Sequence, residues 1–205
     1  MIAIIDYGMG NVRSLTNALE YIGADVVLSA DPGELAEADR LLLPGVGAFG
    51  DAMEAINASG LRDTLDRLAM SERKPVLGVC LGMQLFAKSS DEHGGHAGLG
   101  WLDAEVKRIV AAPPAKVPHV GWNAVSFSAD EWLFKGLPSG ESDYYFVHSF
   151  HMVCADPSDV AGTTDHGGTI TAAVRRDNLV AAQFHPEKSQ DNGLQLLQNW
   201  LEHEF

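Results

Sequence analysis

Cys80 is the residue whose neighbours best suit it to act as a nucleophile. It stands in Gly78-Val79-Cys80-Leu81-Gly82, the glycine spacing of a sharp strand-to-helix turn. Both glycines are needed because such a turn leaves no room for side chains. A helix beginning at Leu81 would point its free N–H groups and its positive dipole end at the sulfur, which favours a thiolate and can later hold an oxyanion. A buried cysteine packed as a small hydrophobe is the alternative.

His185 and Glu187 could supply the base that Cys80 needs. Proline at position 186 favours an extended conformation at His185. Residues two apart in an extended chain point to the same side, so we expect Glu187 to hold the second ring nitrogen of His185. This gives a nucleophile, a base and an orienting acid in that order. Without Cys80, a salt-bridged histidine at a strand end would be an equal reading.

The glycine-rich segment 44–50, with the sequence PGVGAFG, is a third candidate. It lacks the G-x-G-x-x-G spacing and the lysine of phosphate-binding loops. We interpret it as flexible backbone that supplies an N–H group to an oxyanion near Cys80. A plain turn between a strand and a helix is the alternative.

The other polar residues predict no metal site. His93 and His96 flank two glycines and indicate a solvated loop, and Asp91-Glu92 reads as a solvated charge pair. His148 and His151 are three positions apart, so in one strand they would face opposite ways and would not share a metal.

The elements that must position these residues predict a doubly wound, flavodoxin-like α/β sheet. Asn11 is a plausible N-cap, and Gly23 a plausible end, of the first helix. In such sheets ligands bind beyond the carboxyl ends of the strands, where the turns after these strands would meet. The first half alternates strands at 2–5, 25–28, 40–43 and 76–79 with helices at 12–22 and about 61–68.

The second half is richer in strands, which we expect to be antiparallel or mixed additions to the sheet. A hairpin turn is predicted at 176–178. The chain ends in a helix that carries Leu194, Leu197 and Leu201 on one face. The predicted strands are 105–110, 120–127, 144–147, 150–153, 169–174 and 179–184.

Bulk properties fit one globular domain over residues 1–205. The net charge of −14 argues against binding to nucleic acid or to an anionic membrane. Two cysteines do not make a disulfide framework, and we expect Cys154 to be a core residue. The N-terminus reads as a strand and no apolar run approaches membrane-span length, so we expect a soluble, cytoplasmic protein.

Three segments, 44–50, 78–84 and 185–187, closely resemble the class I (triad) glutamine amidotransferases. The resemblance covers essentially the whole chain. Within that family, the chain most resembles the glutaminase subunits of imidazole glycerol phosphate synthases. That narrowing depends on the segments 6–11, 116–123, 145–149 and 188–189.

The resemblance implies a mechanism without cofactor or metal. Cys80 attacks the side-chain amide of L-glutamine. His185, oriented by Glu187, protonates the departing ammonia and then activates water to release glutamate from a thioester. The resemblance also implies an oxyanion hole from the N–H groups of Leu81 and Val46, the second after a peptide reorientation at Gly45-Val46.

The same resemblance assigns glutamine binding to four positions. These are Gly47, Gln84, Ser149 and Phe150, and His148 is expected to line the same pocket. Family members often have tyrosine at the position of Phe150. Contact through the backbone would make that difference unimportant.

The resemblance also implies a separate partner, a (β/α)8-barrel cyclase subunit that receives the ammonia through its barrel. The expected products are imidazole glycerol phosphate and an aminoimidazole carboxamide ribotide, on the route to histidine. The barrel is expected to dock over Met9, Asn11, Trp122, Tyr145 and Lys188. A core aromatic is the alternative for Trp122, and a solvated lysine the alternative for Lys188.

Three rival functions stay open at this point. One is another amidotransferase, such as the glutaminase of pyridoxal phosphate synthase or of a purine-pathway enzyme. A second is a catalytically silent relative that only binds and regulates a partner. A third is a cysteine hydrolase of the α/β-hydrolase type, in which the acid usually precedes the histidine, whereas Glu187 follows His185.

Overall fold

The computed structural model describes residues 1–138 and 140–205. The strands within these ranges are β1 (Ile2–Ile5), β2 (Val26–Ser29), β3 (Arg40–Leu43), β4 (Val76–Val79), β5 (Ser89–Ser90), β6 (His96–Ala97), β7 (Ala104–Arg108), β8 (His119–Phe127), β9 (Glu141–His148), β10 (Phe150–Cys154), β11 (Val160–Asp165), β12 (Thr169–Arg176) and β13 (Leu179–Ala182). The α-helices are α1 (Val12–Tyr21), α2 (Pro32–Glu37), α3 (Phe49–Ala58), α4 (Arg62–Asp66), α5 (Leu81–Leu85) and α6 (Gln190–Glu202).

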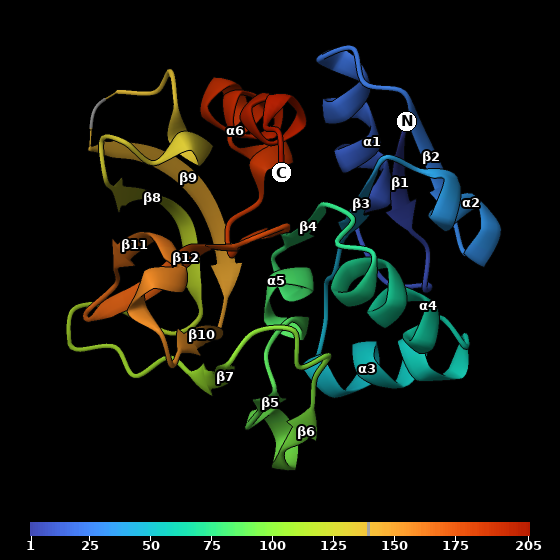
Figure 1. Cartoon of the computed structure of the whole chain (residues 1–205). Helices are drawn as coiled ribbons and strands as arrows, with labels where there is room; N and C mark the ends of the chain where they lie inside the picture. Colours follow the sequence, from blue (N-terminus) through green and yellow to red (C-terminus); the bar gives the residue numbers. More distant parts are fainter. Residues whose placement is uncertain (139) are drawn as a thin grey trace.

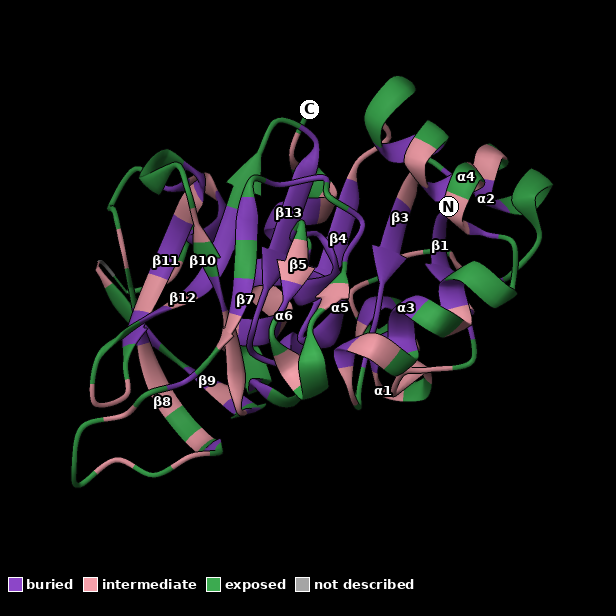
Figure 2. Ribbon diagram, turned by 90° about the horizontal axis from the view of Figure 1, so that it is seen from below, coloured by how far each residue is buried: buried purple, intermediate pink, exposed green. Residues whose placement is uncertain are grey.

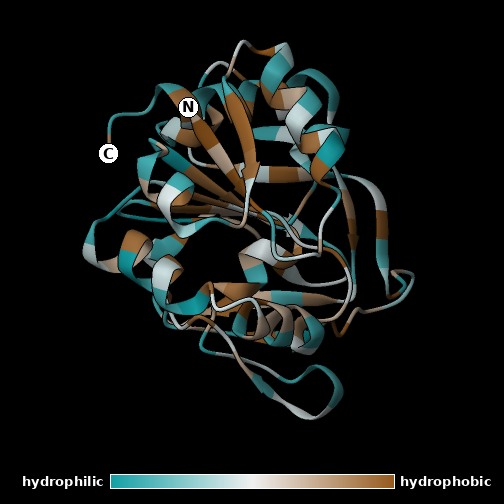
Figure 3. Cartoon of the chain, turned by 90° about the vertical axis from the view of Figure 1, so that its right-hand side faces the viewer, coloured by the Kyte–Doolittle hydropathy of each residue, from teal (hydrophilic) through white to brown (hydrophobic). Residues whose placement is uncertain are grey.

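One large mixed sheet dominates the fold, with strand order β2-β1-β3-β4-β13-β12-β11-β8-β9 (Figure 1). Its first five strands are parallel and follow the flavodoxin-like order. Side chains of β1 alternate between two apolar clusters, Ile2 and Ile4 on one face and Ala3 and Ile5 on the other. Burial on both faces explains why β1, β4 and β13 contain no charged or polar side chain, and why β3 is apolar after Arg40; the brown strands of Figure 3 show this apolar centre. The edge strand β2 is only partly buried. The predicted doubly wound sheet is therefore confirmed.

The last strand, β13, joins the two halves of the sheet. It pairs in parallel with β4 and antiparallel with β12. The hairpin turn predicted at 176–178 is present and carries Asp177 at a φ of 51°. This inserts a strand from the end of the chain directly beside the strand that precedes Cys80. Strands β12, β11, β8 and β9 continue the sheet in antiparallel fashion.

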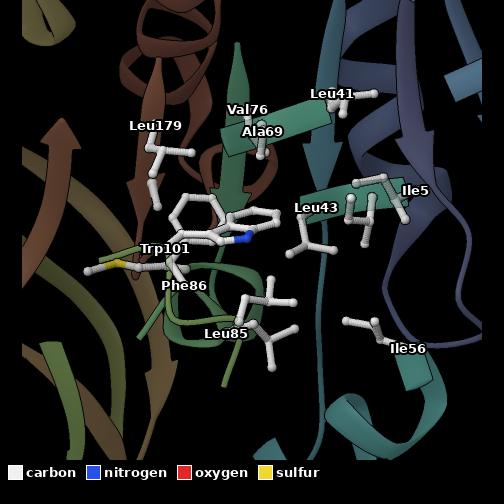
Figure 4. Packing of buried hydrophobic residues seen from close by; sticks show 14 of the residues in the cluster. Ile5, Leu41, Leu43, Ile56, Ala69, Val76, Leu85, Phe86, Trp101 and Leu179 are labelled. Carbon is white, nitrogen blue, oxygen red and sulfur yellow. The ribbon is translucent and has the colours of Figure 1, made fainter. Parts of the chain in front are cut away.

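A smaller sheet, ordered β10-β7-β5-β6, lies below the large one in Figure 1. Between the large sheet and helices α3 and α5, Leu43, Ile56, Leu85, Phe86 and Trp101 pack into one cluster (Figure 4). The central strands of the large sheet are buried along their length, whereas exposure concentrates on outer helix faces and loops (Figure 2). A rigid, packed sheet therefore supports the edge at which its parallel strands end.

The structure corrects several local predictions. The buried residues of α6 are Gly193, Leu196, Leu197, Asn199 and Trp200. Leu194 and Leu201 are only partly buried, although Leu201 packs against the same apolar cluster as Leu197. The helix predicted around Leu61–Leu68 is α4, followed by a turn of π-helix at Arg67–Ser71.

Asn11 does stand at the start of α1. Its side chain makes no bond to the helix N–H groups and instead accepts a hydrogen bond from the hydroxyl of Ser14. Helices α2 and α3 and strands β5, β6 and β11 were not predicted. Among the described residues, no helix is long and apolar enough to cross a membrane.

Candidate active site

Cys80 stands at a strained turn between β4 and α5, with φ 55° and ψ −111°. A Cβ added to Gly78 would lie 2.9 Å from the carbonyl oxygen of Gly82, and a Cβ on Gly82 would overlap the carbonyl oxygen of Leu43. The bend therefore requires both glycines, as the spacing predicted. Strain in a non-glycine residue persists only where its surroundings enforce it.

Cys80 and His185 are more than a hundred positions apart in the sequence, and the pairing of β4 with β13 brings them to the same edge of the sheet. Val79 is in register with Ala182, and the N–H of Cys80 donates to the carbonyl of Ala182 at 2.8 Å. Both strands end at the same edge, so the chain leaving β13 runs directly past the thiol. The N–H of His185 donates to the carbonyl of Tyr145 at 2.9 Å, which fixes the backbone of His185 against β9.

His185 and Glu187 form the second part of the site. Nδ1 of His185 lies 2.8 Å from Oε1 of Glu187, and both side chains are buried. His185 has an extended backbone, but Pro186–Lys188 is a turn of 3₁₀ helix. The predicted contact is therefore present, but the extended-chain argument for it was wrong, because the turn brings Glu187 back under the ring.

The surroundings of His185 favour its protonated form. Burial lowers the pKa of the imidazole, but its interactions with Cys80 and Glu187 outweigh burial and raise the pKa to about 9. Nε2 of His185 is buried and makes no hydrogen bond of good geometry among the described residues. A protonated imidazole beside a sulfur can donate its proton to a leaving group.

A cavity of about 400 Å³ opens in front of Cys80 and His185. The structure brings all four positions predicted for glutamine binding, and two of the three for the oxyanion hole, to this cavity. Those lining residues are Val46, Gly47, Leu81, Gln84, Ser149 and Phe150. His148 lines it as well, as expected.

Gly45, the remaining oxyanion-hole prediction, is not among the residues that line the cavity, but it packs against residues next to the cavity. A Cβ at Gly45 would come within 2.9 Å of the backbone N of Gly82, the Cβ of Leu81 and the hydroxyl of Tyr7. That hydroxyl donates to the carbonyl of Pro44 at 2.7 Å. The glycine-rich segment is thus pressed against the first turn of α5, where the N–H of Leu81 has no partner within the helix.

Glu92 is a site residue that sequence reasoning missed. The sequence indicates a solvated pair at Asp91-Glu92, but Glu92 is half-buried and lines the cavity. Its Oε2 accepts the backbone N–H of Phe49 at 2.7 Å, at the start of α3, which has no side-chain cap at Ala48. No local motif marks Glu92, because the loop that carries it meets the glycine-rich segment only in the folded chain.

Gln84 points its amide away from solvent into a buried network. Its Nε2 donates to the carbonyl of Phe150 and to Oε1 of Gln183, both at 2.9 Å. Only Oε1 of Gln84 is left for a ligand in the cavity. Nε2 of Gln183 in turn lies 3.8 Å from the sulfur of Cys80.

His148 belongs to a chain of neutral imidazoles. Its Nδ1 bonds the carbonyl of Phe150 at 2.8 Å, and its Nε2 lies 2.9 Å from Nδ1 of His119. Burial, with smaller contributions from neighbouring histidines, lowers the pKa of His119 to about 3. Burial outweighs the bond to Phe150 and lowers the pKa of His148 to about 4. Among the described residues no group of three or more histidine, cysteine or acidic side chains could hold a metal ion.

The residues predicted for the partner interface fall in two places. Trp122 and Tyr145 face each other across β8 and β9, with ring centroids 6.2 Å apart, and Nζ of Lys188 lies 5.7 Å from the ring centroid of Tyr145. Trp122 is 49% exposed, so it is not a core aromatic. Met9 and Asn11 lie in the loop before α1, where Met9 packs against Gly47.

A family model described as glutamine amidotransferase class-I matches residues 3–203. The chain is 46% identical over 206 residues to "Imidazole glycerol phosphate synthase subunit HisH 2" of Nitrobacter winogradskyi, covering 98% of this chain and 97% of the relative. It is 47% identical to the corresponding subunit HisH of Sulfurimonas denitrificans, covering 99% and 98%.

Solved structures share the fold at lower identity. A glutamine amidotransferase crystal structure superposes with a TM-score of 0.75 at 20% identity, covering 98% of both chains. A putative GMP synthase protein from Thermoplasma acidophilum gives a TM-score of 0.72 at 23% identity, covering 98% of this chain and 91% of that one. At these identities the structures support the fold alone.

Proposed function

The chain belongs to the class-I glutamine amidotransferase family, and on that premise we propose that it is the glutaminase subunit of an imidazole glycerol phosphate synthase. The observation that carries the proposal is the buried pair of His185 and Glu187, 2.8 Å apart, at the same cavity as Cys80 on its strained turn. We propose that the whole of residues 1–205 forms one amidotransferase domain.

In the proposed reaction the sulfur of Cys80 attacks the side-chain carbonyl carbon of L-glutamine. A tetrahedral oxyanion forms and then collapses to a thioester as the C–N bond breaks. His185 gives its proton to the departing nitrogen, which leaves as ammonia. The neutral imidazole then takes a proton from water, which attacks the thioester and releases glutamate and the free thiol. Glu187 holds the ring through Nδ1 in both steps.

Backbone N–H groups are proposed to hold the oxyanion. Leu81 supplies one from the first turn of α5, where helix N–H groups are free. The second would come from Val46 after the peptide between Gly45 and Val46 turns over. Support for that rotation is the absence of a side chain at Gly45 and the 40% exposure of Val46.

Two side chains are proposed to receive the charged end of glutamine. Glu92 lines the cavity and has one carboxylate oxygen on the N–H of Phe49, so its negative charge and its second oxygen suit the α-ammonium group. Gln84 contributes its free Oε1 as a second acceptor. The backbone at Gly47, Ser149 and Phe150 would complete the site.

The proposed partner is a (β/α)8-barrel cyclase subunit that takes up the ammonia. Support comes from the solvent face of β8 and β9, where Val120 pairs with Val147 and Trp122 with Tyr145. Val120, Trp122 and Val147 are exposed apolar residues, and Val147 and Lys188 also line the cavity. An apolar surface continuous with a reaction cavity is suited to a partner that receives the product.

A cytoplasmic location is part of the proposal. Cys80 and Cys154 are both free, and the proposed reaction needs Cys80 as a thiol. A reducing compartment would keep it so.

A glutaminase assay tests the proposal. The chain is incubated with L-glutamine, with and without the candidate cyclase and the nucleotide-like ligand of that cyclase, and glutamate and ammonia are measured. We expect release that depends on the partner and is abolished in Cys80→Ala. Glutamate release that persists in Cys80→Ala with the partner present would defeat the proposal. Activation by the barrel of a different synthase would reassign the pathway.

A further inference from the structure

We infer that Gln183 is a positioning residue for the nucleophile: its side-chain N–H group donates to the sulfur of Cys80 and holds the sulfur in the orientation for attack. The inference rests on the proposed function, and it concerns a residue outside the three-residue set of Cys80, His185 and Glu187. Gln183 is fully buried, and its Nε2 lies 3.8 Å from the sulfur.

The backbone places Gln183 beside the sulfur. Gln183 directly follows β13, at a bend two positions before His185. The carbonyl of the preceding residue, Ala182, accepts the N–H of Cys80 at 2.8 Å, so Gln183 begins directly beside the nucleophile. Its own N–H donates to the carbonyl of Ala172 at 2.8 Å, which extends the pairing of β13 with β12. The sheet thus presents both an amide and an imidazole to Cys80.

The orientation of the Gln183 amide is dictated by a carbonyl further along the network. The carbonyl oxygen of Phe150 can only accept, so the atom of Gln84 that faces it must be the donor Nε2. That same nitrogen faces Gln183, whose nearer atom must therefore be the acceptor Oε1. The other end of the Gln183 amide, which faces Cys80, is then necessarily the N–H donor.

The carbonyl oxygen of Phe150 also accepts a hydrogen bond from His148, which in turn contacts His119. Because Phe150 only accepts, Nδ1 of His148 carries a proton and Nε2 of His148 is an acceptor. Nδ1 of His119 must then donate to it, and the amide of Asn123 donates to the remaining nitrogen of His119 at 3.1 Å. The carbonyl of Phe150 thus accepts from both Gln84 and His148, and every amide and imidazole of the network has only one orientation that satisfies these bonds.

An N–H group aimed at sulfur favours the charged form, because a hydrogen bond to an ionised acceptor is stronger than one to its neutral form. In a fully buried position that preference is little weakened by solvent. Gln183 does not line the cavity, so it has no access to glutamine. Its contribution should therefore appear in the reactivity of the thiol rather than in substrate binding.

Alkylation of the intact chain by iodoacetamide tests the inference without glutamine or partner. The rate at Cys80 is followed by mass spectrometry across a range of pH, with Cys154 in the same molecule as a reference thiol. The variants are Gln183→Met, which keeps the length of the side chain without its polar atoms, and Gln183→Glu, which places a negative charge there. Gln198→Met, on the exposed face of α6, is the matched control.

At pH 7 we expect Gln183→Met to slow alkylation of Cys80 about tenfold or more. Gln183→Glu should slow it further, because a carboxylate repels a thiolate. The rate at Cys154 and the Gln198→Met variant should match the wild type. In the glutaminase assay, kcat should fall in Gln183→Met with little change in KM. Wild-type rates and pH dependence at Cys80 in both folded Gln183 variants would overturn the inference, as would a loss confined to KM.

If the variants do not fold, Cys154 becomes exposed and its alkylation is faster than in the wild type. A second measurement then tests the inference. The side-chain amide protons of Gln183 are then followed by NMR in the wild type and in Cys80→Ala. We expect one of them to shift when the sulfur is removed, and no shift would overturn the inference. Failure of the wild type to hydrolyse glutamine would instead defeat the proposed function and leave the alkylation result standing.

Discussion

Gly82 lies directly against the carbonyl oxygen of Leu43, with no space for even one carbon atom between them. The contact joins the first turn of α5 to the end of β3, and it fixes where the turn carrying Cys80 sits on the sheet edge. The approach of Gly78 to the carbonyl of Gly82 fixes the same turn from the other side.

Gly82→Ala should therefore destabilise the protein strongly. The added methyl group would meet backbone atoms, which cannot rotate away as a side chain can, so we expect a loss of about 3 kcal/mol or more in the free energy of unfolding. Gly60→Ala is the control, because its φ is 74° but no atom lies near its Cβ position. Backbone strain alone should cost it about 1–2 kcal/mol. Urea unfolding measures both, and equal losses would contradict the role of the Leu43 contact.

Glu187→Gln should change both the rate and the pH profile of glutamine hydrolysis. The wild-type rate should fall as pH rises through about 9, where His185 loses the proton that the leaving ammonia needs. The variant loses an interaction that raises this pKa, so the decline should move to lower pH. We also expect kcat to fall about 10²-fold or more. Assays from pH 6 to 10 with the partner present measure the effect, and an unmoved alkaline limb would contradict it.

The neutral pair of His119 and His148 should make the fold sensitive to acid. Their pKa values in the folded chain, about 3 and about 4, lie below the ordinary 6.5. Between pH 6.5 and these lower values, the two histidines bind protons in the unfolded chain but not in the folded chain. The free energy of unfolding therefore falls as the pH drops below 6.5. His119→Gln, which keeps a hydrogen-bonding side chain without titrating in this range, should show a shallower decline.

The acid prediction is checked by unfolding midpoints between pH 7 and 4. The net charge of −14 also shrinks on acidification and relieves repulsion, so slopes of variant and wild type are compared rather than absolute values. His93→Gln, on an exposed loop, is the control. If His119→Gln and His93→Gln declined equally with pH, the pair would have no role in acid sensitivity.

Glu92→Gln should weaken glutamine binding while keeping the cap on α3. The amide oxygen can still accept the N–H of Phe49, so only the charge toward the cavity is lost. We expect KM for glutamine to rise about tenfold or more, with a smaller effect on kcat. Asp91→Asn removes the neighbouring exposed charge and should leave KM unchanged. An unchanged KM in Glu92→Gln would remove Glu92 from the substrate site.

Local sequence patterns were sufficient to predict the parallel part of the sheet and the turn at Cys80. The bend at Cys80 was predictable because the two glycines that it requires, Gly78 and Gly82, lie within two positions of Cys80 in the sequence. The contact of Glu187 with His185 was predicted from local spacing, although a turn rather than a strand produces it. Glu92 and Gln183 were missed for a common reason. Their partners, Phe49 and Cys80, lie 43 and 103 positions away, and only the paired strands and packed loops bring them together.

Lys188→Ala should chiefly weaken coupling to the partner. Its ammonium group lies over the ring of Tyr145, at the point where the cavity meets the exposed face that carries Trp122. The substitution removes a side chain that lines the cavity and supports the ring of Tyr145, so we expect ammonia to escape before the cyclase uses it. We expect the yield of cyclase product per glutamine hydrolysed to fall, while hydrolysis itself falls less. Lys135→Ala, on a distant exposed turn, is the control, and a wild-type yield in Lys188→Ala would refute the assignment.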